Sequence, residues 1–346
     1  MVSVMGKRGL FLVWLCLVSI LPGMAQTEKL IDYVNPFVGT DGYGNVYPGA
    51  QIPFGGIQMS PDTDSKYYDA ASGYKYNHST LLGFSLTHLS GTGIPDLGDF
   101  LFIPGTGEMK LDPGTREEPE KGYRSRYSHE KEWASPNYYA VELSDYGVKA
   151  EMTSGVRSGM FRFTYPQSDK AFIMIDMNHT LWQSCEWANL RMENDSTITG
   201  YKLVKGWGPE RHIYFTATFS KKLTGLRFMQ NKKPVIYNTS RFRSSYEAWG
   251  KNLMACISFD TKAGEEVIVK TAISSVSTNG AKNNMAELAG LTFDDLKAKG
   301  EALWEKELGK YTLTADRKTK EPSIRRLIMR LCIRSSFRMQ TDNFAD

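Results

Sequence analysis

The apolar residues of this chain fall into short runs, and this division restricts the fold more than any other feature of the sequence. The runs at 171–176, 212–219, 253–259 and 267–273 have strand length and are rich in β-branched and aromatic residues. Turn-forming residues separate them, and the pattern extends from about residue 30 to residue 278 with no repeat of fixed period. The sequence therefore predicts an all-β fold. The simplest arrangement of so many strands is a large sandwich of two packed antiparallel sheets.

The pattern changes from strands to a helix near residue 292. Thr292 and Asp295 have the spacing of a capping box, which predicts a helix over 293–309. Apolar residues follow at helical spacing, at Leu296, Leu303, Trp304 and Leu308. A solitary sandwich has little reason to keep such an apolar face, so the helix favours a linker to a further domain.

The first 25 residues are typical of an export signal. Lys7 and Arg8 form a short positive region, residues 9–21 form an apolar run, and small residues precede a cleavage point at Gln26. An apolar run of about 13 residues is shorter than the roughly 20 that cross a bilayer. We therefore expect an exported protein, periplasmic or extracellular, with no membrane span in the mature chain.

Charge and cysteine content exclude several classes of function. The formal net charge is +4 and the basic residues are interspersed with acidic ones, so no nucleic acid or anionic membrane surface is expected as a partner. After the signal the cysteines are Cys185, Cys256 and Cys332, whose wide spacing supports neither a disulfide framework nor a zinc site. Buried free thiols are favoured over one disulfide pair.

Residues 33–99 combine many glycines with aromatic and polar residues, which is typical of tight turns and ligand-facing loops. Six short blocks within this segment are recognisable: GTD at 39–41, YPGAQ at 47–51, PFG at 53–55, SPDT at 60–63, SGY at 72–74 and THLSGTG at 87–93. Together they resemble the N-terminal signature of glycoside hydrolase family 92, the secreted exo-acting α-mannosidases. The resemblance continues through DMNH at 176–179 and the segment 272–284.

The resemblance implies a fold and a chemistry for the whole family. It implies a galactose-mutarotase-like β-sandwich (a supersandwich) packed against an (α/α)6 barrel, and calcium-dependent, inverting removal of mannose from glycans. Inverting hydrolysis needs a general acid and a general base about 6.5–9.5 Å apart. In the family both lie on the helical barrel. No catalytic residue is therefore assigned in this chain, which is expected to be inactive alone, and no calcium ligand is identified.

These observations predict four parts of the chain. They are a signal peptide at 1–25, a sandwich domain at 26–280, a helical linker at 281–312 and the start of the helical catalytic domain at 313–346, with the barrel itself missing. After Glu321 the chain is more basic than the aromatic helix of the family. One choice of codons for residues 322–334, when it is read two bases later, encodes a peptide that resembles that aromatic helix. A truncated or frame-shifted start and a natural divergent end both stay open.

The loops of residues 87–99 supply four candidate sugar-binding residues. His88 and Thr92 are expected to face sugar hydroxyls, because both side chains offer a hydrogen-bond donor and an acceptor. The alternative for His88 is a bond to a neighbouring loop carbonyl. Asp96 and Asp99 are candidates for sugar hydroxyls or for an oxygen-ligated calcium site. Their alternative is a turn organised through their own backbone.

Tyr68 and Asp69 lie where relatives carry Trp-Asp in the subsite for the leaving sugar. The resemblance therefore implies mannose release with these two residues near the leaving group, but no linkage specificity.

Other chemistry-bearing residues receive structural interpretations. Three histidines are scattered without metal-ligand spacing and are expected to be structural, at His129, His179 and His212. Three tryptophans are candidates for a sugar-stacking platform, but burial in the sandwich is favoured for Trp182, Trp187 and Trp207.

Two hypotheses remain. The chain is the N-terminal domain of an exported α-mannosidase, or it is a stand-alone carbohydrate-binding or structural β-sandwich.

Overall fold

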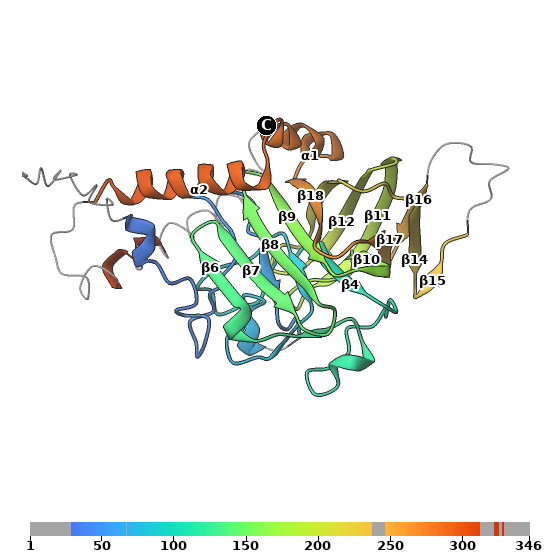
Figure 1. The fold of residues 1–346 in the computed structure, drawn as a ribbon, viewed down its shortest axis with the longest axis horizontal. Helices are drawn as coiled ribbons and strands as arrows, with labels where there is room; N and C mark the ends of the chain where they lie inside the picture. The colour runs from blue at the N-terminus through green and yellow to red at the C-terminus, as the bar shows by residue number, and fades with distance from the viewer. Residues whose placement is uncertain (1–28, 67, 237–245, 312–321, 325–326, 329–346) are drawn as a thin grey trace, which may run out of the picture.

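The computed structural model describes residues 29–66, 68–236, 246–311, 322–324 and 327–328. The predicted signal peptide, Cys332 and nearly all of the predicted segment 313–346 lie outside the described residues. Figure 1 shows two large sheets packed face to face, with α2 running along one side. Within the described ranges, no helix combines the length and the apolar character that crossing a membrane requires.

Every strand pair in the described sheets is antiparallel, and each sheet has a simple order. The seven-stranded sheet has the order β1-β3-β4-β10-β17-β14-β15. Its strands are β1 (Ser60–Asp62), β3 (Gly83–Ser85), β4 (Leu101–Thr106), β10 (Ser168–Asp176), β17 (Leu253–Thr261), β14 (Gly225–Gln230) and β15 (Lys233–Pro234).

The nine-stranded sheet has the order β16-β11-β12-β13-β18-β9-β8-β7-β6. Its strands are β16 (Glu247–Gly250), β11 (Ser184–Asn194), β12 (Thr197–Lys205), β13 (Arg211–Phe219), β18 (Glu265–Ser274), β9 (Ser158–Tyr165), β8 (Val148–Ser154), β7 (Tyr138–Leu143) and β6 (Glu132–Ser135). A small third sheet pairs β2 (Thr80–Leu81) with β5 (Ser125–Arg126). The four predicted runs lie in β10, β13, β17 and β18, so the predicted all-β sandwich is confirmed.

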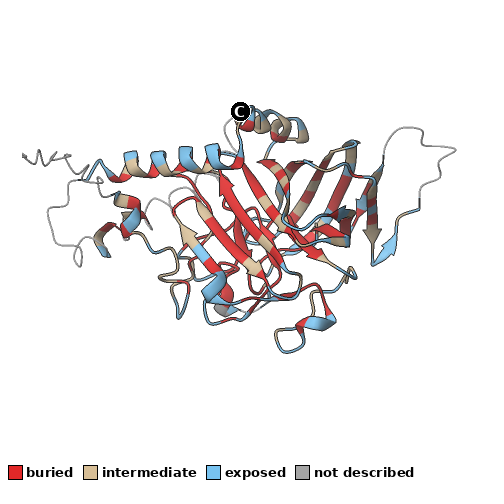
Figure 2. Ribbon diagram, viewed as in Figure 1, coloured by how far each residue is buried: buried red, intermediate tan, exposed pale blue. Residues whose placement is uncertain are grey.

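The core lies between the two large sheets, where side chains alternate between a buried inner face and the opposite face (Figure 2). Phe84 and Phe102 of the seven-stranded sheet pack against Phe161, Phe163 and Phe215 of the nine-stranded sheet. The Phe102 and Phe161 ring centroids are 5.0 Å apart. Burying one such side chain stabilises the fold by about 1.5–3 kcal/mol.

The seven-stranded sheet is covered on its other face as well. Phe172 and Met174 of β10 are buried there, under Met109, Leu111 and Tyr146. Both faces of β10 are therefore apolar, which explains why its sequence is a continuous apolar run and does not alternate.

The helical elements are short except for α2. Among the described residues, the labelled α-helices are α1 (Thr278–Asn284) and α2 (Phe293–Leu308), and the 3-10 turns are η1 (Leu30–Tyr33), η2 (Tyr68–Ala70), η3 (Pro119–Lys121), η4 (His129–Lys131) and η5 (Met285–Leu288). The capping box of Thr292 and Asp295 is present, so the predicted start of α2 is confirmed.

The apolar face of α2 is covered by residues of this chain. It consists of Phe293, Leu296, Gly300, Trp304 and Leu308, whereas Leu303 lies one position off this face and is exposed. The Trp304 ring is buried against η1, and its Nε1 donates to the Gln51 carbonyl at 2.7 Å. Ile324 and Ile328, which belong to the predicted segment 313–346, lie in the same cluster as Trp304 and Leu308, and the assignment of α2 as a linker stays a prediction. The buried Cys185 and Cys256 are free thiols, as predicted.

Candidate functional site

Three loops meet at one end of the sandwich, and they bring most of the predicted site residues together. They are residues 63–66 after β1, residues 87–99 between β3 and β4, and residues 177–183 between β10 and β11. The Leu181 amide donates to the Leu97 carbonyl at 2.9 Å, and the Trp182 amide donates to the Ser65 carbonyl at 3.1 Å. These backbone bonds fix all three loops relative to one another.

An open polar hollow of about 780 Å³ lies beside these loops. Its wall carries amide, carboxylate, ammonium and imidazole groups, among them Lys66, Asp176, Asn178, His179 and Asn252. The indole of Trp182, which is 57% exposed, adds an aromatic surface and meets the 55% exposed ring of Tyr68 edge to face, with centroids 6.0 Å apart. Such a mixture of hydrogen-bonding groups with exposed rings is suited to a polar, uncharged ligand.

The end of β10 is shaped to deliver His179 to this hollow. Asp176 is the last residue of β10, and its Oδ1 accepts from the Asn178 amide at 2.8 Å, which turns the chain sharply. Its other carboxylate oxygen accepts from the Tyr123 hydroxyl at 3.2 Å. His179 follows, and its carbonyl accepts from Lys202 Nζ at 2.6 Å.

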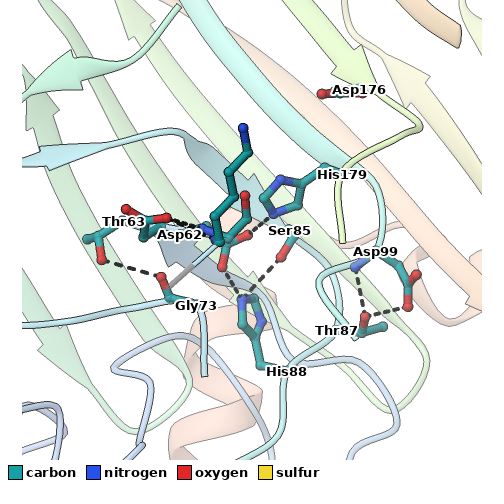
Figure 3. A network of polar contacts seen from close by, with 12 residues as sticks. Asp62, Thr63, Gly73, Ser85, Thr87, His88, Asp99, Asp176 and His179 are labelled. Carbon is teal, nitrogen blue, oxygen red and sulfur yellow. Dashed lines mark hydrogen bonds and ion pairs between the residues drawn. The ribbon is translucent and has the colours of Figure 1, made fainter. Parts of the chain in front are cut away.

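A buried carboxylate between two histidines supports the wall of the hollow (Figure 3). Asp62 Oδ2 accepts from His179 Nε2 at 2.8 Å, and its Oδ1 lies 2.8 Å from His88 Nε2. The Ser85 hydroxyl is also 3.1 Å from His88 Nε2. Burial by itself raises the pKa of Asp62, but the neighbouring His88 and His179 outweigh it and hold that pKa well below its usual range.

His88 is an internal member of this network. It has no exposed surface, and its Nδ1 donates to the Gln58 carbonyl at 2.8 Å. Both ring nitrogens thus lie within hydrogen-bond distance of oxygen atoms inside the protein. The loop-carbonyl bond named as the alternative from sequence is present, and any effect of His88 on a sugar would act through Asp62 and His179.

Gly73 is required beside Asp62 for two reasons. Its φ is +86°, in the left-handed region, and a Cβ at this position would lie 2.0 Å from Asp62 Oδ1. The glycine of the SGY block therefore allows the 72–74 turn to pass directly against the carboxylate.

Asp99 anchors a second buried network. Its carboxylate accepts from Arg211 through two nitrogens, at 2.6 and 3.1 Å, and lies 3.0 Å from Lys202 Nζ. It also accepts from the Thr87 hydroxyl at 2.7 Å. Burial raises the pKa of Asp99, but Arg211 and Lys202 outweigh it and hold the pKa well below its usual range.

The other predicted site residues lie at different depths. Asp96 is buried, and burial raises its pKa despite the nearby Arg211. Its Oδ1 accepts from the Leu97 amide at 2.6 Å, which is the turn named as its alternative. The Thr92 hydroxyl, near the surface, donates to the Ile94 carbonyl at 3.2 Å. The side chain of Asp69 lies outside the described residues, and sugar contact by all six residues stays a prediction.

Asp96 and Asp99 do not form a calcium site in this structure. Two cationic side chains occupy the oxygens of Asp99, and a divalent cation there would meet both of them. Among the described residues, no group of three or more histidine, cysteine, aspartate or glutamate side chains is arranged to hold a metal ion. No calcium ligand is therefore identified among the described residues, and the calcium implied by the resemblance stays a prediction.

Sequence reasoning missed the residues that organise the networks. Asp62 lies in a recognised block but received no role, His179 was expected only to be structural, and nothing in their spacing showed that they meet. The burial of Lys202 was predictable from the sequence, because alternation along β12 places this residue between the inward-facing Gly200 and Val204. The expected burial of Trp182, Trp187 and Trp207 is wrong, since loop positions and the outer sheet face leave all three exposed.

Residues 33–274 match the family described as glycosyl hydrolase family 92 N-terminal domain. A solved family GH92 α-mannosidase from Bacteroides thetaiotaomicron is 89% identical, with a TM-score of 0.84, over 86% of this chain and 40% of that one. A GH92 inverting mannosidase from strain VPI-5482 of the same species shares the fold, at 23% identity over 88% of this chain and 40% of that one, with a TM-score of 0.74.

A more distant similarity exists to a curated fungal protein. An uncharacterized secreted glycosidase of Arthroderma benhamiae is 30% identical over 147 residues, which are 42% of this chain and 19% of the fungal protein. The chain spans about two fifths of the length of the solved relatives and a fifth of the curated one.

Proposed function

Because this chain belongs to glycoside hydrolase family 92, with residues 33–274 as the family's N-terminal domain, we propose that it is part of an exported, inverting α-mannosidase. Its substrates are glycans with terminal α-mannosyl residues. The observation that supports this most strongly is the 89% identity to the Bacteroides thetaiotaomicron α-mannosidase. That enzyme has also been solved in complex with mannoimidazole.

The described residues form a recognition surface and not a catalytic pair. The pKa of Asp62 and the pKa of Asp99 both lie well below their usual range, so at neutral pH neither carboxylate has a proton to give to a leaving sugar. We assign the general acid and base to the part of the longer relatives that this chain does not span. Calcium ligands are assigned to the same part.

The role of this chain is to shape one side of the substrate pocket. Tyr68 and Trp182 offer aromatic surfaces for the leaving glycan, and the amides and carboxylates of the hollow offer hydrogen bonds to its hydroxyls. Asp62 orients His179, and the Asp99 network holds the 87–99 loop against β12 and β13.

A chimaeric enzyme tests the function directly. In this chimaera the Bacteroides thetaiotaomicron α-mannosidase carries residues 33–308 of this chain in place of its own N-terminal part. We expect hydrolysis of an aryl α-mannoside with inverted anomeric configuration, and loss of that activity with a chelator. A folded chimaera that hydrolyses no α-mannoside would contradict the proposal.

The chain alone provides the complementary measurement. Loss of general acid–base catalysis costs roughly 10²–10⁴-fold in rate, so no turnover of an aryl α-mannoside is expected from the purified 346-residue chain. Chelator-sensitive turnover by the chain alone would show that the acid and base lie within it. Glycan binding by the chain together with an inactive chimaera would instead support the stand-alone carbohydrate-binding alternative.

Export is proposed from the signal-like residues 1–25 and from the secreted fungal relative. Fractionation of cells that produce the full chain, with N-terminal sequencing, should find a mature protein beginning at Gln26 outside the cytoplasm. A cytoplasmic protein that keeps its first residues would contradict this part of the proposal.

A further inference from the structure

Five ring-bearing side chains point outward from four neighbouring strands of the nine-stranded sheet, and none of them lines the hollow. We define the aromatic face as Trp249 on β16, Trp187 on β11, Tyr201 on β12, and His212 and Tyr214 on β13. Strands β16, β11 and β12 are labelled at the right-hand end of Figure 1. Inward-facing neighbours of these residues, such as Ala188, Ala248 and Phe215, are buried in the core.

The rings of the aromatic face are accessible and ordered across the sheet. Trp187 is 46% exposed and Trp249 is 53% exposed. The Tyr201 and Tyr214 ring centroids are 4.8 Å apart, and the Tyr201 hydroxyl is 2.9 Å from His212 Nδ1. Asn189 of β11 is paired with Trp249 on one side and with Tyr201 on the other, and Trp187 precedes Asn189 by two residues on the same face of β11, so the rings surround one amide side chain.

The charges around the aromatic face are paired with one another. Lys251 Nζ lies 3.0 Å from Glu186, and Arg191 Nε lies 3.6 Å from Glu193. Asn189 Nδ2 donates to Glu247 at 3.0 Å, which places an amide and a carboxylate between the rings. This composition gives stacking surfaces with hydrogen-bonding groups between them and little net charge. It is complementary to an uncharged polyhydroxyl ligand and unlike a nucleic-acid surface.

The aromatic face begins where the hollow ends. β11 starts at Ser184, directly after Gln183, which lines the hollow. The turn between β12 and β13 packs against this wall, since a Cβ on Gly206 would lie 2.3 Å from Gln183 Cγ. The next residue of that turn, Trp207, is 57% exposed. Exposed rings therefore continue from the hollow over the edge of the sheet.

From this arrangement we propose that the aromatic face is a second glycan-binding surface, which holds an uncharged polysaccharide away from the hollow. Pyranose rings lie on Trp187 and Trp249 with their C–H faces, and the polar groups between the rings bind hydroxyls. The choice of α-mannan as the polysaccharide rests on the proposed function. The surface itself rests only on the geometry of the rings.

Binding of soluble α-mannan by the full chain tests the surface. The double variant Trp187→Ala/Trp249→Ala should bind at least about 10-fold more weakly, because two exposed anchors are removed. The matched control is Trp133→Ala, which removes a 50% exposed tryptophan from β6 at the opposite edge of the same sheet and should leave affinity unchanged. Equal affinity of all variants would overturn the proposal.

Hydroxyl-radical footprinting of the unsubstituted chain avoids any dependence on how a variant folds. Added α-mannan should protect Trp187 and Trp249 from oxidation and leave Trp133 unprotected. If Trp187 and Trp249 are protected without glycan, and more so at higher protein concentration, the face is a contact between copies of the chain. If they are already protected in the chimaera before glycan is added, the face is a contact between domains. Either result overturns the proposal.

The mannose assignment and the surface are separable. If the same two tryptophans mediate binding of a neutral β-glucan but not of α-mannan, the surface stands and the mannose class is wrong. Hydrolysis by the chimaera then reports on the proposed function independently.

Discussion

Replacing Asp62 with Asn tests whether one buried charge holds the wall of the hollow. The substitution keeps the size of the side chain but leaves one acceptor oxygen where the carboxylate has two. One of the two histidines then faces an NH2 group in place of an acceptor. Asp62 has no exposed surface, so water does not replace the lost contact.

The expected loss is large for a change of so few atoms. A buried N–H group that loses its acceptor costs about 1–3 kcal/mol, because nothing replaces the lost hydrogen bond. Domains of 150–250 residues lose roughly 2–4 °C per kcal/mol, so the melting temperature of D62N should fall by roughly 2–12 °C.

The loss should also depend on pH, with a sign that the structure defines. Burial raises the pKa of Asp62 but His88 and His179 lower it more, so the pKa in the folded state lies below that of the unfolded chain. Such a carboxylate stabilises the fold fully above its unfolded pKa of about 3.9, and the contribution is lost as pH falls through the folded value. The gap between wild type and D62N should therefore be wider at pH 5 than at pH 3.

Urea unfolding of both proteins at pH 7, 5 and 3, followed by tryptophan fluorescence and circular dichroism, measures these quantities. The control is Asp195→Asn, which removes an exposed carboxylate paired with Lys222 and should change stability by less than about 0.5 kcal/mol. A D62N protein within that same margin of wild type at pH 5, or an equal gap at pH 3 and pH 5, would refute the reasoning.

Three further substitutions examine the loops. Gly73→Ala should lower the free energy of unfolding by about 2 kcal/mol or more, because the added Cβ collides with Asp62. The control Gly264→Ala has a similar φ of +75° but open space around the Cβ, and it should lower that free energy by about 1 kcal/mol. Equal losses in the two variants would show that the collision does not occur. Thr92→Val in the chimaera should lower kcat/KM roughly 2- to 12-fold if the hydroxyl binds sugar, and unchanged kinetics would make it structural. Tyr68→Ala should shift preference among mannoside linkages more than the rate on an aryl mannoside, and a uniform loss on all substrates would place the ring elsewhere.

The sequence predicted those features that depend on neighbouring residues. Strands β10, β13, β17 and β18 follow from β-branched and aromatic runs, and the start of α2 follows from the Thr292 and Asp295 pair. These signals are local, because period and capping are properties of a few consecutive residues.

The networks at the site were not predictable in the same way. Asp62 and His179 are separated by 117 positions, and Asp99 and Arg211 by 112. Only the order of strands in the sheets brings such residues together, and no spacing in the sequence encodes that order. Burial of His88 is likewise a consequence of loops that close over it.

The contact between η1 and α2 has a consequence for how the chain acquires its fold. The Ile31 amide donates to Glu305 at 2.8 Å, which joins positions 274 residues apart. Closing a loop of this length costs about 5 kcal/mol of chain entropy in addition to a constant term. That contact forms only after almost the whole sandwich has been synthesised. Ile31 and Tyr33 therefore pack late in folding, and they then cover the ring of Trp304. Removal of the segment before Val34 would leave the strands able to pair but would expose that indole, making the end of α2 the first part of the described fold to open.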